Sequence, residues 1–346
     1  MSKTLAILVA ASVALASACA SRLASESGPE QDPLTGEDAF TAHASRHAIV
    51  LTHGFDPSRP DRWSFYKVED VLRADGHVVH TASVSPYAGV AARAAELGAH
   101  VATALRECRA RAGCDASQVH IIAHSIGGLD ARYLISKLGY GAAVASLTTI
   151  STPHRGSYLA DVALDTTSAD RGEAISAVGS VWGRALTEDD VARDGDVQSA
   201  LSSMSERTVR ESFNPDVQDD PRVTYLSLAG VSEVVGVPGH GDLEACEGKL
   251  PLRVGIRDGM EPSLAPAASF VGHGVEMRPN DGVVTVESAK WGKFMGCVPA
   301  DHMDEVGQPK HGRQPLTGFD HVELYRKLAS SLDDEVAAHA ALAASP

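Results

Sequence analysis

The feature that most constrains the fold is a short apolar run that passes through a glycine-containing turn directly into a helix-forming segment. The run is residues 119–123 (VHIIA), the turn is residues 124–128 (HSIGG), and the chain continues as LDARYLISKL. A strand that turns into a helix this sharply needs small side chains, because strand and helix pack closely there. The segment therefore predicts a strand, a strained turn and a helix, with the hydroxyl of Ser125 projecting above the edge of a sheet.

Short apolar runs alternate with longer segments of helical periodicity along most of the chain. This pattern predicts helices at residues 90–112 and 319–344, and strands at residues 47–52, 78–84, 119–123, 147–151 and 223–229. Such alternation is typical of a mostly parallel sheet with helices on both faces. Together with the strand-turn-helix segment, it predicts an α/β-hydrolase fold for residues 46–346, a length that is ample for one buried core.

One segment, from about residue 157 to about residue 221, interrupts this alternation and is too long for a simple crossover. Asp170 and Glu173 occupy the positions of a helix capping box. Apolar residues then recur at helical spacing, at Ile175, Val178, Val181, Trp182, Ala185 and Leu186. We expect an inserted helix, which is either a packed surface helix or a mobile lid over an apolar cleft.

The N-terminal 45 residues indicate export. Residues 1–18 combine Lys3, an apolar run too short to span a bilayer and a small-residue cleavage pattern, as in a signal peptide. Cys19 follows at once, as in the lipobox of bacterial lipoproteins, although Leu15 stands four residues before the cysteine instead of three. Lipid anchoring and free secretion therefore both stay open. Residues 19–45 are polar and rich in Ser, Gly, Pro and acids, which predicts a flexible tether.

Charge and cysteine content limit the partners and the compartment. The chain has 45 acidic and 30 basic residues, a net charge of −15, which repels nucleic-acid phosphates and anionic membranes. We therefore expect no nucleic-acid partner. Four cysteines remain beyond Cys19, and an even number in an exported protein favours disulfides over metal ligation. Of the three possible pairings, proximity along the chain favours Cys108 with Cys114 and Cys246 with Cys297.

Ser125 stands where a nucleophilic serine is expected, with Ala123 in place of the first glycine of a GxSxG motif. A serine needs a base and an orienting carboxylate, which α/β-hydrolases supply in the order Ser, Asp or Glu, His. Asp281, in an Asn-Asp-Gly turn, followed by His302 satisfies this order. Three further histidines compete for the role of base: His273, His311 and His321.

An oxyanion hole requires two backbone N–H donors directed at the developing negative charge. Ile126 follows the nucleophile and supplies one donor in this fold. The other is expected from the loop after an early strand, where IVLTHGF places a glycine before Phe55. The N–H of Phe55 is therefore the second candidate donor.

Six segments occur in the order, and near the spacing, seen in the pseudomonad-type bacterial true lipases: IVLTHGF, AHSIGGLDARY, STPHRGS, NDGVVTV, DHMDEVGQ and LYRKLASSL. The resemblance covers about residues 47–332 and is loosest at 158–220 and 232–275. It implies hydrolysis of triacylglycerols, with Ser125 as nucleophile, His302 as base and Asp281 as orienting acid. It also implies Phe55 and Ile126 as oxyanion donors.

The resemblance further implies one structural calcium ion. In the family, the ligands are a carboxylate two residues after the catalytic histidine, two later backbone carbonyls and a remote aspartate. The matching positions are Asp304, Gln308 and Gly312, with Asp242 as candidate for the remote ligand. These are hard oxygen donors, which calcium prefers. The ion is expected to stiffen the loop that holds His302; otherwise Asp304 is a solvent-facing acid.

The chain also departs from the family. Glu287 and Ser288 stand where the family's usual disulfide would place a cysteine, so dependence on the family's folding chaperone does not follow. Aromatic content is 5% and the insertion is rich in alanine, which suits a modest acyl pocket. A phospholipase or a soluble short-chain esterase is therefore the alternative to a lipase at a lipid–water interface. A third possibility is a non-catalytic surface binding protein, against which the intact nucleophile, acid and base argue.

Overall fold

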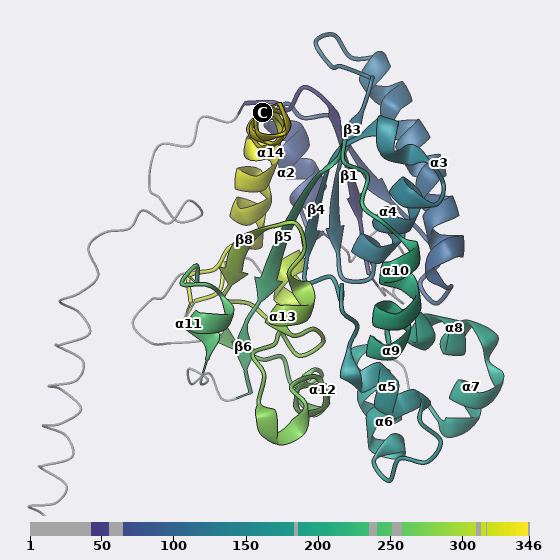
Figure 1. The fold of residues 1–346 in the computed structure, drawn as a ribbon. Coiled ribbons are helices and arrows are strands. Elements are labelled where there is room, and N and C mark those ends of the chain that lie inside the picture. The colour runs from purple at the N-terminus through teal and green to yellow at the C-terminus, as the bar shows by residue number, and fades with distance from the viewer. Residues whose placement is uncertain are drawn as a thin grey trace, which may run out of the picture. The chain divides into compact units, whose positions relative to one another are not determined.

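Six parallel strands form the central sheet, in the order β2-β1-β3-β4-β5-β8 (Figure 1). Their bounds are β1 Ala48–Thr52, β2 Val79–Ala82, β3 Val119–His124, β4 Val144–Ile150, β5 Thr224–Gly230 and β8 Lys293–Val298. Strands β1, β3 and β4 are buried along their whole length. Burial on both faces explains why their sequences do not alternate between apolar and polar residues.

This computed structural model describes residues 43–54, 65–182, 186–234, 241–250, 258–308, 313–315 and 317–344, all within the unit Phe40–Pro346. The predicted signal peptide, Cys19 and most of the predicted tether lie outside the described residues. Within the described part of the chain, no helix has both the length and the apolar character needed to cross a bilayer.

Helices cover both faces of the sheet (Figure 1). On one face lie α3 (Val90–Arg109) and α4 (Gly127–Ser136), and on the other lie α2 (Val68–Ala74) and α14 (His321–Ala343). Leu97 of α3 and Leu134 of α4 share one apolar cluster with β1 and β3. The predicted helices at 90–112 and 319–344 are therefore present, with ends that differ by up to three residues.

A helical insertion follows β4, as the length of the segment predicts. It contains α5 (Tyr158–Leu164), α6 (Arg171–Val181), α7 (Glu188–Arg193), α8 (Gly195–Met204), α9 (Glu206–Thr208), a π-helical turn η2 (Val209–Phe213) and α10 (Asn214–Asp216). Ile175, Val178 and Trp182 are buried in one cluster with Ile126. The predicted capping box is wrong, because Asp170 makes no side-chain capping bond to α6. Ala185 lies outside the described residues, and the role of a mobile lid stays a prediction.

Between β5 and α14 the chain forms short elements around β8. They are β6 (Ser232–Glu233), α11 (Asp242–Ala245), β7 (Asp258–Gly259), α12 (Ala265–Val271), η3 (Gly274–Glu276), α13 (Val286–Ala289) and η4 (Asp304–Val306); η1 (Tyr140–Ala143) precedes β4. Both predicted disulfides are present, Cys108–Cys114 and Cys246–Cys297. The second ties the end of α11 to β8 and so braces this region.

The strand order changes direction beside β1, because β2 lies on one side of β1 and β3 on the other. In open parallel sheets, ligands bind beyond the carboxyl ends of the strands at such a switch point. His53 and Gly54 follow β1 directly, and Ser125 follows β3. The topology thus brings the start of the loop after β1 and the turn after β3 to the same place.

Candidate active site

Ser125 occupies a strained turn between β3 and α4. Its φ of 57° is in the left-handed region, which costs a non-glycine residue about 1–2 kcal/mol. The Ser125 N–H donates to the carbonyl of Ile150 at 2.9 Å, and Thr152 Oγ1 donates to the Ser125 carbonyl at 2.6 Å. These bonds hold the backbone in place, so that the strained conformation persists in the folded chain.

Two glycines allow the loop after β1 to touch this turn. A Cβ added at Gly54 would lie 2.5 Å from Cβ of Ser125, and one at Gly127 would lie 2.8 Å from the carbonyl oxygen of His53. Both separations are too short for any side chain. Glycine is therefore required at these positions by close approach of the backbone.

His302 and Asp281 form a buried hydrogen-bonded pair. Nδ1 of His302 donates to Oδ2 of Asp281 at 2.8 Å, and the His302 backbone N–H donates to the Asp281 carbonyl at 3.0 Å. The other carboxylate oxygen of Asp281 accepts from the N–H groups of Val283 and Val284 at 2.8 and 2.7 Å. Because Asp281 takes the hydrogen on Nδ1, Nε2 of His302 is left as the basic atom.

Ser125 and His302 line the same cavity. Much of its remaining lining is apolar and comes from the helical insertion, from the residues after Asp281 and from η4, including Leu159, Val178, Trp182, Leu201, Val283 and Val306. The structure thus brings the predicted nucleophile and the predicted base to one apolar cavity.

The competing histidines that the structure describes are engaged elsewhere. His273 Nε2 lies 3.0 Å from Oε1 of Glu206, and His321 Nε2 lies 2.8 Å from the carbonyl oxygen of Tyr66. Neither is among the residues that line the cavity. His311 lies outside the described residues.

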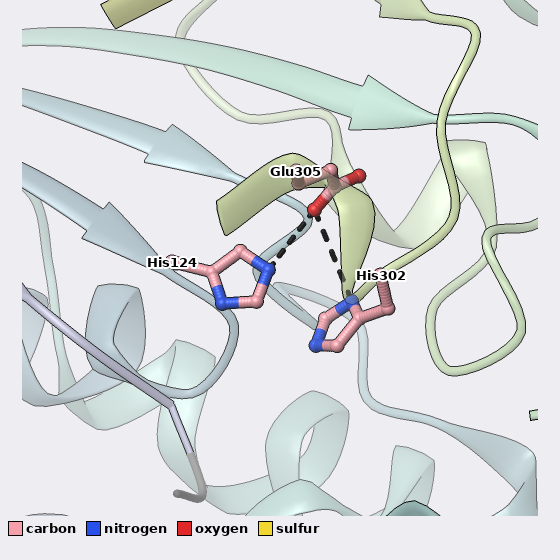
Figure 2. A group of neighbouring side chains, drawn as sticks. All are labelled: His124, His302 and Glu305. Carbon is pink, nitrogen blue, oxygen red and sulfur yellow. Dashed lines mark hydrogen bonds and ion pairs between the residues drawn. The ribbon is translucent and has the colours of Figure 1, made fainter. Parts of the chain in front are cut away.

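A second buried group adjoins His302 and was missed from the sequence (Figure 2). Glu305 Oε2 lies 3.0 Å from Nε2 of His124 and 4.0 Å from Nδ1 of His302, and Ser151 Oγ donates to Glu305 Oε1 at 2.5 Å. The ring centroids of His124 and His302 are 4.4 Å apart. The signal was present, because Glu305 stands three residues after His302 and His124 directly precedes Ser125.

Burial controls the charge of this second group. It lowers the pKa of His124 well below its usual value, and the neighbouring His302 lowers it further. Burial also raises the pKa of Glu305 well above its usual value, and the nearby Asp281 adds to the rise. Burial therefore favours the neutral forms of His124 and Glu305, while Asp281 is the carboxylate that accepts the hydrogen bond from Nδ1 of His302.

Arg93 and Asp130 form a fully buried ion pair behind the loop that follows β1. Arg93 Nε donates to Asp130 Oδ2 at 2.8 Å, while Nη2 donates to the carbonyls of His53 at 2.9 Å and Gly54 at 3.3 Å. Burial raises the pKa of Asp130 to about 6, although Arg93 opposes the rise. Buried ion pairs seldom add net stability. We therefore interpret this one as fixing the loop against Ser125, a role that the sequence did not reveal.

The predicted oxyanion donors are only partly described. Ile126 is the residue that precedes α4, so its N–H lies at the positive end of the helix dipole. Phe55 lies outside the described residues. The position of its N–H stays a prediction from the sequence.

Three aspartates gather on the far side of the loop that carries His302. Oxygen atoms of Asp258, Asp301 and Asp304 all lie within 4.8 Å of one another, and all three residues are buried. Burial and the charges of the other two aspartates raise the pKa of Asp304 to about 9. Burial and Asp301 raise that of Asp258 to about 7. Buried, mutually repelling carboxylates are the donor set that fits a hard divalent cation.

The structure places the predicted calcium ligands differently from expectation. Asp304 is buried and not a solvent-facing acid. Its aspartate partner is Asp258, because β7 pairs with β6 and carries Asp258 to this point. Asp242 lies in α11 and, among the described residues, does not belong to this group. Gln308, four residues after Asp304 in sequence, is also buried. Gly312 lies outside the described residues.

Comparison with known sequences points to ester hydrolases. Residues 42–194 match the family model described as "Putative serine esterase (DUF676)". The chain is 27% identical to triacylglycerol lipase 2 of Saccharomyces cerevisiae, over 69% of this chain and 60% of that one. It is 32% identical to a triacylglycerol lipase of Pseudarthrobacter phenanthrenivorans, over 48% of this chain and 53% of the other. The chain thus spans little more than half the length of these relatives.

A third relative is matched along most of its length. The triacylglycerol lipase of Vibrio cholerae is 29% identical, over 83% of this chain and 88% of that one. The pseudomonad-type character inferred from the motifs stays a prediction.

Solved structures decide the fold. The metagenomic carboxyl esterase MGS0156 superposes with a TM-score of 0.59 at 18% identity, over 90% of this chain and 81% of that one. Lipase 1 of Pelosinus fermentans gives a TM-score of 0.55 at 21% identity, over 83% and 98%. The chain has the α/β-hydrolase fold. Within this fold, Ser125 occupies the turn after β3 that the elbow motif predicts.

Proposed function

We propose that this chain is a serine ester hydrolase that cleaves acylglycerol esters through an acyl-enzyme on Ser125. One observation carries the proposal: Ser125, on a strained turn, and His302, held by Asp281 at 2.8 Å, line the same apolar cavity. A serine, a base and an orienting acid at one rim are the requirements for nucleophilic acyl transfer.

The chemistry follows from these positions. Ser125 Oγ attacks the ester carbonyl while Nε2 of His302 accepts the hydroxyl proton, and Asp281 stabilises the imidazolium that forms. The tetrahedral oxyanion accepts from the N–H of Ile126 and from that of Phe55. His302 then gives its proton to the departing alcohol, which leaves the acyl group on Ser125. Water, deprotonated by His302, hydrolyses this ester and regenerates the serine.

The apolar cavity supports an acyl chain as the group that is bound. Leu159, Val178, Trp182 and Leu201 offer no charge to a polar substrate. The relatives named triacylglycerol lipases support glycerol esters over other esters. Two disulfides and the predicted signal peptide support action outside the cytoplasm, in free or lipid-anchored form.

We also propose a structural calcium ion at the aspartate cluster. Asp258 and Asp304 would hold it through carboxylate oxygens, with backbone carbonyls of the following loop, including that of Gln308, completing the shell. Bound calcium supplies positive charge that offsets the repulsion among the aspartates. Asp301 accepts from the backbone N–H groups of Met303 and Asp304 at 2.9 Å each, and so shapes the turn beside His302.

The test of the proposed function is hydrolysis of p-nitrophenyl butyrate and of emulsified tributyrin. We expect Ser125→Ala and His302→Ala to lower kcat by about 10⁴-fold or more on both substrates. Ser330→Ala, in α14 and outside the cavity lining, is the matched control and should leave kcat unchanged. Circular dichroism checks that each variant is folded. Retention of wild-type kcat in folded Ser125→Ala would refute the proposal.

A further inference from the structure

The turn after α12 presents two apolar side chains to solvent. Val275 is 99% exposed and Met277 is 74% exposed. Large apolar side chains that face water cost free energy unless a partner covers them. The backbone here is also held in the left-handed region, with φ of 58° at His273 and 49° at Met277. The chain thus maintains a strained turn that exposes apolar groups.

One ring contact links this turn to the residues around the cavity of the candidate active site. The ring of His273 stacks on that of Tyr158 with centroids 4.4 Å apart, and its Nε2 is bonded to Glu206 at 3.0 Å. Tyr158 is 40% exposed and stands between Ser157 and Leu159, which both line the cavity. In Figure 1, α12 lies beside α6 at the end of the sheet where α5 also lies. Through this contact, the turn that carries the exposed pair lies close to residues that line the cavity.

The chain also leads from this turn directly to the catalytic acid. Arg278 N–H donates to the carbonyl of Gly272, which closes the base of the turn. Met277 stands four positions before Asp281 in sequence. The turn is thus joined to Asp281 by a short segment of chain.

The size of the exposed group argues for a fluid lipid surface as its partner. A stable protein interface buries about 800 Å² per partner, which two side chains and one ring cannot supply. Liquid hydrocarbon adapts to isolated side chains, and a tyrosine suits the polar boundary above it. The net charge of −15 disfavours anionic surfaces. The surface is therefore expected to be uncharged or zwitterionic.

We propose that Val275 and Met277, backed by Tyr158, insert into a neutral lipid–water interface and hold the cavity against it. This inference rests on the proposed function, because it gives that esterase an insoluble, aggregated substrate. It also selects acylglycerols at a surface over soluble short-chain esters as the working substrate.

The experiment compares the double variant V275S/M277S with the matched control Leu342→Ser. Leu342 is 76% exposed and lies near the C-terminal end of α14, at the opposite end of the molecule from α12 in Figure 1. Each protein is assayed on dissolved p-nitrophenyl acetate and on emulsified tributyrin. We expect V275S/M277S to lose about tenfold or more of its tributyrin activity with no change on p-nitrophenyl acetate. Leu342→Ser should retain both activities.

A binding measurement separates the interface from the chemistry. In a Ser125→Ala background, the full chain is sedimented with phosphatidylcholine vesicles, and V275S/M277S should reduce the bound fraction while Leu342→Ser does not. Equal loss on both esters, undiminished tributyrin activity, or stronger binding to phosphatidylglycerol vesicles would each overturn the proposal. If wild type cleaves neither ester, the proposed function fails, whereas vesicle binding still decides the role of the turn.

Discussion

Asp281 and Asp304 both lie close to His302, Asp281 through a hydrogen bond and Asp304 two residues further along the chain. The surroundings of the two carboxyl groups differ. Asp281 accepts three N–H groups, from His302 Nδ1 and from the backbones of Val283 and Val284. Asp304 faces two other aspartates, and its pKa is raised to about 9 by burial and by their charges. One carboxylate is stabilised by the chain itself, and the other needs a proton or a cation.

The difference separates two tasks that both serve His302. Fixed N–H donors hold the Asp281 carboxylate in one position, which a permanent orienting acid requires. Repulsion among Asp258, Asp301 and Asp304 is relieved by bound protons or by the calcium ion that we propose. On the side of Asp281, hydrogen bonds fix the loop that carries His302. On the side of the aspartate cluster, we expect the position of the loop to depend on how the carboxylate charges are neutralised. The following experiments test each side.

The largest effect is expected from Asp281→Asn. An amide at this position reverses the hydrogen-bonding preference at Nδ1 of His302, and kcat on a dissolved ester should fall by about 10⁴-fold. The exposed Asp334→Asn, in α14, is the control. A loss below about tenfold, together with full loss in D281N/E305Q, would transfer the orienting role to Glu305, which lies 4.0 Å from Nδ1.

Arg93→Lys should have the next largest effect. Lysine cannot bond Asp130 and the carbonyls of His53 and Gly54 together, so the loop beside Ser125 loses its fixed position. We expect kcat to fall by about 10²-fold with KM nearly unchanged. Arg106→Lys, on the exposed side of α3, should leave both constants as they are. An unchanged kcat in Arg93→Lys would mean that the buried pair is structural only.

Calcium should stabilise the wild type but not Asp258→Asn. A ligand at 100 times its dissociation constant adds about 2.7 kcal/mol to the free energy of unfolding. Thermal unfolding with calcium or with a chelator measures this difference. Asp242→Asn should respond to calcium as the wild type does, because Asp242 lies outside the aspartate cluster. Loss of the response in Asp242→Asn instead would restore the ligand expected from the sequence.

The smallest effect concerns pH in the presence of a chelator. The pKa values of Asp258 and Asp304 are raised from 3.8 to about 7 and about 9, so the folded chain holds these protons more tightly than the unfolded chain. Their stabilising contribution is complete below about pH 4 and is lost as pH rises through these values. The unfolding temperature should therefore decline from pH 5 to pH 9, and calcium should flatten the decline. A steeper decline with calcium would contradict this account.

Local sequence predicted those parts of the molecule in which neighbouring residues determine the structure. The buried runs of β1 and β3 and the turn at Ser125 are encoded within a few residues of each other. β8 was missed because KFMGCV, with a lysine and a glycine, lacks a continuous apolar pattern. Asp258 was missed because its approach to Asp304 depends on pairing of β6 with β7.

Arg93 shows the same limit on a helix. In the sequence, Arg93 is typical of a charged residue on the solvent-facing side of a helix. Only the fold reveals Asp130 and the loop carbonyls that surround it. Non-local partners of this kind decide which polar residues are buried, and no local pattern records them.

The central claim is that Ser125 is an activated nucleophile, and reaction with a fluorophosphonate tests it most directly. Peptide mass analysis of the labelled full chain should place one adduct on Ser125, slowed in Asp281→Asn and absent in Ser125→Ala. An adduct on another serine, or equal labelling of folded Ser125→Ala, would contradict the account.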